Sequence, residues 1–437
     1  MYKLSMCNDC LYDTKFIFCL SRIFGVSPVS FVKSPMHAEE YVETKPSRNV
    51  VGSLFSVMVF CAMAVGLILS VAECIMNGVK DAGGLVHHIV SQPMVFLSAG
   101  VSIAMHFTVS RLKIAELLQH LSCINQVIIH KQRQYCVDVK QRNPLTSVMT
   151  LVTVFFSHLL FLGLNFFLRT RYYQKYILSV TLIVADLVNF VIVVQFCNFV
   201  RCIRYTLTEL IRIIAVDTDG NLVRYSVKRG FKSRQQFGQR SSSCSAVHID
   251  MIKETAPFRR DLSHPTPGEA LSVHHIMFCR RVYNEVYDAH ALVNSIYGIP
   301  ILLIFVLNVT FCIINVYYIF MDPSTISFLM ESRLQRTEGL IFRVLWFFVC
   351  TTVALYVTVS CQMVTLESSK LNEKIQKRLL LNSIQRDSVR QFKLFSDQIS
   401  KNCIEFSAAC FFTIDMSLFC TYVATTITYT IVLVQFK

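Results

Sequence analysis

The stretch YGIPILLIFVLNVTFCIINVYYIF, residues 297–320, contains no Asp, Glu, Lys or Arg. An α-helix needs about 20 mostly apolar residues to cross the hydrocarbon core of a bilayer. This stretch is long enough and apolar enough to do so, and it therefore predicts a transmembrane helix.

Six further apolar runs lie on both sides of this stretch. Of the 437 residues, 53% are hydrophobic and 16% are charged, and the mean hydropathy is +0.49. A soluble protein carries about 25% charged residues. We therefore predict an all-α membrane protein surrounded by lipid. Its seven transmembrane helices are expected near 50–72, 86–107, 148–168, 176–200, 297–320, 341–363 and 404–436.

The basic residues of the connections orient these spans. The N-terminal segment and the second, fourth and sixth connections carry 34 of the 42 Lys and Arg residues, whereas the opposite side carries 7. Basic residues accumulate on the cytoplasmic side, so we expect a cytoplasmic N-terminus and an extracellular C-terminus. This orientation is inverted relative to G-protein-coupled receptors. It also accounts for the net charge of +14 without nucleic acid as a partner.

The last span has a polar face. Its five polar residues follow one another at intervals of four, four, three and seven, which places them along one side of a helix. They are Ser417, Thr421, Thr425, Thr428 and Gln435. One interpretation is that several copies of this helix line a cation pore in an oligomer. The other is that the hydroxyls bond back to the i−4 carbonyl and serve helix packing.

Four segments resemble insect gustatory receptors. The chain ends in Thr428-Tyr429, five mostly apolar residues and Gln435-Phe436, which is the T-Y-x5-Q-F ending of that family. Three other segments resemble the family's F-x-A-x-x-x-F-x-I-D approach to the last helix, its V-N-x-x-Y-G entry to span five and its N-terminal F-G-x-x-P turn. These segments are residues 406–415, 293–298 and 24–28.

The resemblance implies a tastant-gated, non-selective cation channel, a homo- or heterotetramer in the plasma membrane of chemosensory neurons. The last span would line the pore, and Gln435 and Phe436 would form its extracellular gate. Sugar-type members tend to carry Glu where this chain has Thr430, so a bitter or other non-sugar tastant is expected. A fructose- or sugar-responsive receptor and an odorant-receptor-type channel are the alternatives.

The spans, the connections and the resemblance together predict an organisation in six parts. Gly, Ser and Pro residues among many basic residues mark the longest connection as a flexible loop. The parts are a cytoplasmic N-terminal segment at 1–49, transmembrane helices one to four at 50–216, the flexible basic cytoplasmic loop at 217–268, transmembrane helices five and six with a preceding cytoplasmic helix at 269–363, cytoplasmic anchor helices at 364–412, and the pore-lining helix seven at 413–437.

Polar residues inside the other spans are candidates for a ligand pocket, with hydrogen bonds between helices as the other interpretation. They are His158, Asn165, Asp186 and Asn189. No nucleophile–base pair, metal cluster or phosphate loop is visible, so we predict no enzyme, no metal and no cofactor. A membrane transporter is the alternative from a different class, but its sequence repeats and interrupted helices are missing.

Overall fold

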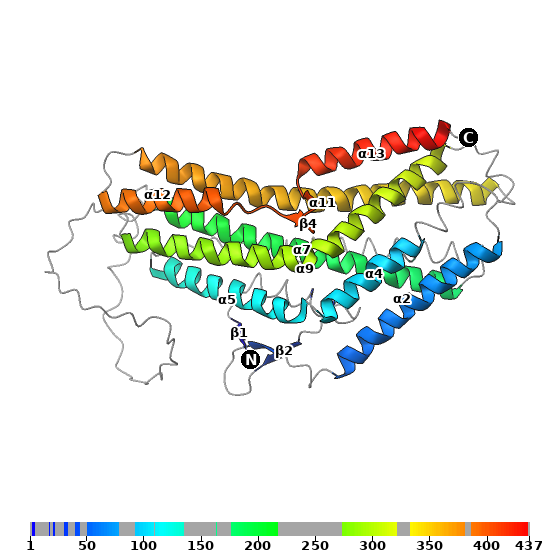
Figure 1. Cartoon of the computed structure of the whole chain (residues 1–437), viewed down its shortest axis with the longest axis horizontal. Helices are drawn as coiled ribbons and strands as arrows, with labels where there is room; N and C mark the ends of the chain where they lie inside the picture. The colour runs from blue at the N-terminus through cyan, green and yellow to red at the C-terminus, as the bar shows by residue number, and fades with distance from the viewer. Residues whose placement is uncertain are drawn as a thin grey trace, which may run out of the picture.

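The computed structural model is nearly all helical (Figure 1). It describes residues 2–4, 17, 21, 30–33, 40–43, 50–77, 92–108, 110–134, 163, 176–216, 273–320, 333–380 and 386–435. The helices of this described part are, in chain order, α2 (Val50–Asn77), α4 (Gln92–Thr108), α5 (Ser110–Gln134), α7 (Tyr176–Val216), α9 (Val273–Phe320), α11 (Arg333–Leu379), α12 (Arg386–Lys401) and α13 (Met416–Gln435).

Two small antiparallel sheets accompany the helices. Strand β3 (Glu40–Glu43) lies between β1 (Tyr2–Leu4) and β2 (Ser30–Lys33) near the N-terminus. Strands β4 (Ser407–Ala408) and β5 (Phe412–Thr413) form a hairpin directly before α13. The sequence had indicated neither sheet.

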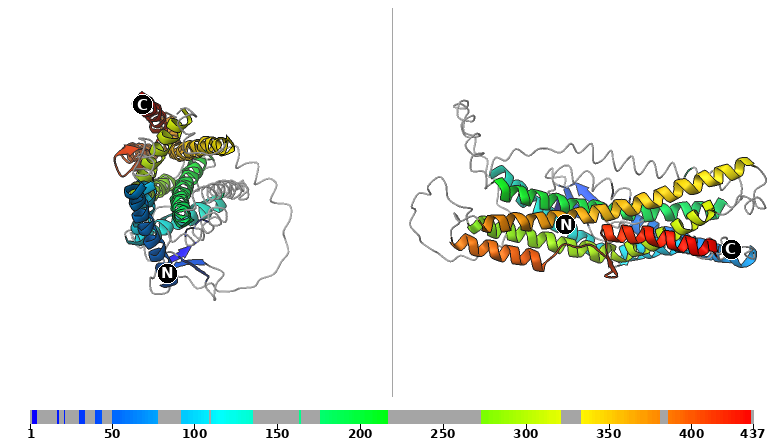
Figure 2. Two further views of the ribbon diagram at one scale, coloured as in Figure 1. Left: turned by 90° about the vertical axis from the view of Figure 1, so that its right-hand side faces the viewer. Right: turned by 90° about the horizontal axis from the view of Figure 1, so that it is seen from above.

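Three long helices form the axis of the molecule. Helices α7, α9 and α11 lie side by side along its whole length (Figures 1 and 2). At a rise of about 1.5 Å per residue, the 48 residues of α9 span about 72 Å, which is more than twice the thickness of about 30 Å of a hydrocarbon core. Each long helix therefore crosses the membrane and continues well beyond it.

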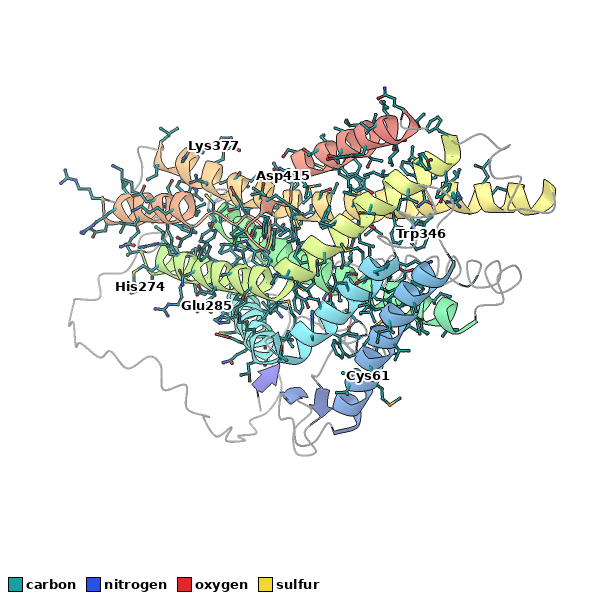
Figure 3. All side chains as sticks on the ribbon, turned by 45° about the vertical axis from the view of Figure 1, so that its right-hand side comes forward. Cys61, His274, Glu285, Trp346, Lys377 and Asp415 are labelled. Atoms are coloured by element: carbon teal, nitrogen blue, oxygen red, sulfur yellow. The ribbon has the colours of Figure 1, made fainter. Side chains whose placement is uncertain are left out.

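The two halves of this bundle differ in their side chains. One half holds α2, α4 and α13 with the apolar parts of the long helices, and Trp346 lies there (Figure 3). The other half, which we call the extension, holds α5 and α12 and carries Lys377, His274 and Glu285 (Figure 3). The extension holds polar contacts such as the Glu367–Lys370 ion pair at 3.2 Å and the hydrogen bond between His120 and Glu285 at 2.7 Å. By length and composition, α7, α9, α11 and α13 of the described chain can each cross a membrane.

Helix α12 packs onto the extension through one face. Its residues Phe392, Phe395 and Ile399 are buried, and the Phe395 ring meets the ring of Tyr283 on α9 edge-on, with centroids 5.9 Å apart. The Tyr283 hydroxyl donates to the carbonyl oxygen of Asn402 at 2.9 Å. Burial raises the pKa of Tyr283 to about 12, so this hydroxyl keeps its proton and the bond holds at any physiological pH.

The approach to the last helix differs from the prediction. We expected anchor helices up to residue 412 and helix seven from Thr413, but α12 ends at Lys401 and α13 begins at Met416. The β4–β5 hairpin lies between them. The helix cannot continue there because Ala409 and Cys410 have positive φ angles of 50° and 61°, in the left-handed region that an α-helix excludes.

Several predicted segments lie outside the described residues. These are span three at 148–168 except Gly163, the start of span two before Gln92, and the loop at 217–268. The other predicted spans overlap with helices, the last of them only from Met416 onward.

Replacing Phe395 by Ala tests the packing of α12. The Phe395 side chain is 0% exposed, whereas its neighbour Leu394 is 40% exposed. Removing a buried Phe side chain costs about 3–5 kcal/mol, whereas a surface change costs about 0.5 kcal/mol or less. We expect Phe395→Ala to lower the thermal unfolding midpoint of the detergent-purified protein and Leu394→Ala to leave it nearly unchanged. Equal midpoints for the two variants would contradict this packing.

Candidate functional site

Helix α13 touches its own subunit through one face only. Tyr422, Thr426 and Thr430 follow one another at intervals of four residues and are buried. In the apolar part of α13 17% of the residues are buried, against 72% in α7. Helix α13 accordingly lies at the edge of the bundle (Figure 2), and most of its surface is open to another partner.

The predicted polar stripe lies on the open face of α13. Ser417, Thr421, Thr428 and Gln435 are exposed, and Thr425 is half-buried. The helix contains no charged residue. The structure therefore turns an uncharged polar stripe away from its own subunit.

The hydroxyls of the stripe bond back to the helix. Thr421 Oγ1 donates to the carbonyl oxygen of Ser417 and Thr428 Oγ1 donates to that of Ala424, both at 2.9 Å. Each hydroxyl donates its one hydrogen to this bond but keeps lone pairs that can accept. These oxygens can thus still contact a cation, so back-bonding and a pore-lining role are compatible on this face.

Asp415 fixes the first turn of α13 (Figure 3). Its Oδ1 accepts hydrogen bonds from the backbone nitrogen of Leu418 at 2.9 Å and from Ser417 Oγ at 2.8 Å. A carboxylate at this position satisfies an N–H group that the helix itself cannot pair, which contributes about 1 kcal/mol. Asp415 is therefore the N-cap of α13 and lies off the polar stripe.

Two of the family-like segments meet in space at the β4–β5 hairpin. Asn294 of α9 donates from Nδ2 to the carbonyl oxygen of Glu405 at 3.1 Å, and its Oδ1 accepts from the backbone nitrogen of Ser407 at 3.3 Å. His290 Nε2, one turn earlier, donates to the same Glu405 carbonyl at 2.7 Å. Burial lowers the pKa of His290, which keeps its ring neutral. Helix α9 thus holds the backbone that leads into α13; we call these contacts the α9–hairpin joint.

Gly298 lets the hairpin approach α9 closely. A Cβ atom on Gly298 would lie 2.9 Å from the backbone nitrogen of Ala409, a distance at which the backbone would have to move. The preceding residue, Tyr297, anchors α9 to α7. Its buried ring packs against Phe196 and Phe199 of α7, with centroids 5.9 Å apart in both cases. The V-N-x-x-Y-G segment therefore packs α9 against the hairpin and against α7.

Two of the four predicted pocket residues line one cavity. Asp186 and Asn189 of α7 border a space of about 50 Å³ between α7, α9 and α11. Asn308 and the rings of Phe311 and Trp346 also border it. This space is large enough for a few water molecules and is smaller than the roughly 300–1,000 Å³ of pockets for drug-sized ligands. A larger tastant would have to displace the surrounding side chains.

A short chain of contacts joins the cavity to α13. Cys350 of α11 borders the cavity and lies beside Cys312 of α9. The Cys312 sulfur lies 2.7 Å from the hydroxyl oxygen of Tyr422 on the buried face of α13. A change in how α9 packs on α11 therefore acts directly on a side chain of α13.

Tyr429 is exposed on α13, and the remaining predicted site residues, His158, Asn165 and Phe436, lie outside the described chain. Conversely, the sequence reasoning missed the aromatic wall of the cavity. Trp346 is the only Trp of the chain, and its place inside a predicted span could have marked it. Among the described residues, no group of three or more His, Cys, Asp or Glu side chains could hold a metal ion.

The bundle crosses the membrane, has a polar face on its outermost helix and encloses a cavity between its long helices. This is the arrangement of a membrane receptor. The family of 7tm chemosensory receptors matches residues 14–437, and the chain belongs to this family. It is a family of receptors and not of enzymes. No curated protein sequence matches the chain.

Solved structures share this fold. The insect olfactory receptor OR5 from Machilis hrabei matches with a TM-score of 0.60 and 14% identity, over 98% of this chain and 100% of that chain. The same receptor in complex with eugenol matches with a TM-score of 0.59 and 12% identity, over the same shares of both chains. The predicted all-α membrane fold and the assignment to the chemosensory receptors are confirmed, whereas the orientation of the termini stays a prediction.

Replacing Gly298 by Ala tests the α9–hairpin joint. The added methyl group meets backbone at 2.9 Å, and overpacking of this kind costs about 1–3 kcal/mol. Gly100 on α4 is the matched control, because a Cβ there meets only a side-chain atom of Phe60 at 3.8 Å. We expect Gly298→Ala to lower the thermal midpoint and the surface expression, and Gly100→Ala to lower neither. A normal Gly298→Ala protein would show that the hairpin does not depend on this approach.

Proposed function

We propose that this chain is a gustatory receptor that acts as a tastant-gated, non-selective cation channel in the plasma membrane of chemosensory neurons. It would work as a homo- or heterotetramer, and its ligand would be a bitter or other non-sugar small molecule. The observation that carries the proposal is the open, uncharged polar face of α13 at the edge of the bundle.

The polar face supports an oligomeric pore because polar groups are costly against lipid. In a lone subunit the exposed Gln435 amide and the lone pairs of Thr421 and Thr428 would face hydrocarbon. Around a common axis they would face water instead. Hydroxyl oxygens without a fixed charge attract cations but hold them weakly enough for them to pass. In this arrangement Gln435, at the end of α13, belongs to the gate together with Phe436.

The cavity supports gating by a small molecule. A ligand between α7, α9 and α11 would alter the contact between Cys350 and Cys312 and hence the position of Tyr422 on α13. The α9–hairpin joint gives α9 a second hold on the same helix, at its start. Movement of α9 would therefore reach α13 at two points, which favours movement of the whole pore helix.

The C-terminal motif favours a taste receptor over an odorant receptor. The chain keeps all four positions of the T-Y-x5-Q-F ending, and Thr430 stands where sugar-type members tend to carry Glu. Thr430 is buried against its own subunit, so it indicates the class of receptor but does not line the proposed pore. A sugar response or an odorant response would identify one of the two alternatives.

The test is whole-cell current in cells that express the chain, challenged with bitter compounds, sugars and odorants. We expect a ligand-evoked cation current that persists when G-protein signalling is blocked. Gln435→Ala should change the relative permeability for different cations, because it removes the amide from the end of the pore. The matched control is Val434→Ala, an exposed neighbour outside the stripe, which should leave permeability unchanged. A response that disappears with G-protein signalling, or equal permeability changes in both variants, would refute the proposal.

A further inference from the structure

We propose that the cavity between α7, α9 and α11 binds the ammonium group of a small primary amine. This inference rests on the proposed function and deepens it, because it names the chemical class of the ligand. The cavity has a polar wall, formed by Asp186, Asn189 and Asn308, and an aromatic wall that includes Phe311 and Trp346. Among the described residues that line it are one carboxylate and no Lys, Arg or His.

The hydrogen bonds of Ser98 fix the orientation of the Asn189 amide. Ser98 Oγ donates its only hydrogen to the carbonyl oxygen of Val95 at 3.0 Å, so it can only accept from Asn189 at 2.9 Å. The Asn189 atom that faces Ser98 is therefore the Nδ2 donor, and Oδ1 is the other atom. This Oδ1 is buried and has no hydrogen-bond partner in the described part of the chain. A buried acceptor without a donor costs about 1–3 kcal/mol, and a ligand N–H group would remove this cost.

Asp186 supplies the charge that an ammonium group complements. It lies three residues before Asn189 on α7, so both side chains project from the same side of the helix, and both border the cavity. A carboxylate within the membrane is costly and usually belongs to a functional site. A primary ammonium offers three N–H donors and one positive charge, which suits one carboxylate and one amide oxygen. A neutral alcohol could donate a hydrogen bond to Asn189 but would bring no positive charge to Asp186.

The aromatic wall suits a cation as well. The rings of Phe311 and Trp346 meet edge-to-face, with centroids 5.7 Å apart and an interplanar angle of 85°. Ring faces attract cations, and Trp is the strongest of the aromatic side chains in this respect. The alkyl part of an amine would meanwhile replace water against Val349 and Val353. The volume of about 50 Å³ limits the buried part of the ligand to the ammonium end and a few carbons.

Trp346 provides a direct binding measurement, because it is the only Trp of the chain and it borders the cavity. The probe is n-propylammonium chloride, titrated into the purified protein at pH 7 while the emission of Trp346 is recorded, with sodium chloride to match ionic strength. The comparison compounds are 1-propanol, which has no charge, and tetramethylammonium, which has charge but no N–H donor. We expect a saturable emission change with n-propylammonium and a far smaller change with either comparison compound.

The same titration on two variants tests the role of the carboxylate. Asp186→Asn should abolish the saturable change, whereas Asp397→Asn, which alters an exposed carboxylate of α12, should keep it. Equal changes with n-propylammonium and 1-propanol in the unaltered protein would overturn the inference whether or not the variants fold. An unaltered protein without any change, or saturable binding in a folded Asp186→Asn protein, would overturn it too.

The titration needs no channel activity, so it separates the two proposals. An emission that does not respond to n-propylammonium, in a protein that conducts cations when a neutral tastant is added, overturns only the ligand class. Saturable binding of n-propylammonium in a protein that never conducts overturns the channel and leaves the amine site in place.

Discussion

The position of α13 depends on the hydrogen bonds between the Asn294 side chain and the backbone of Glu405 and Ser407. These bonds join α9, the longest helix of the core, to the hairpin before α13. Gly298 allows the close approach, and Asp415 then starts the helix at a defined residue. Without this joint, α13 would be held mainly by its narrow buried face, and its polar stripe would have no fixed direction.

The difference between the extension and the membrane half explains how one subunit can have a rigid part and a part that moves. In the extension, buried rings, ion pairs and the bond from Tyr283 to Asn402 fix the ends of α9, α11 and α12. In the membrane half, α13 has few buried residues, and a small polar cavity interrupts the packing of α7, α9 and α11. Movement therefore costs the least free energy in the region of the proposed ligand site and pore.

The sequence predicted those features that depend on local patterns. Apolar runs predicted the spans, and helical spacing placed Ser417, Thr421 and Thr428 on one face. It failed at the hairpin, because contacts from Asn294 more than a hundred residues earlier shape that backbone, and Ala409 and Cys410 give no local sign of a positive φ. The aromatic wall was missed for the same reason, since Phe311 and Trp346 meet only after α9 packs on α11.

The most direct test of the account is the structure of the purified protein in a lipid bilayer, solved with all its subunits. The account predicts four copies around one axis, with the face of Ser417, Thr421 and Thr428 directed at that axis and Tyr422 directed into its own subunit. A single subunit, or an assembly in which the polar stripe of α13 faces lipid at the outside, would contradict the central claim that this helix lines a cation pore.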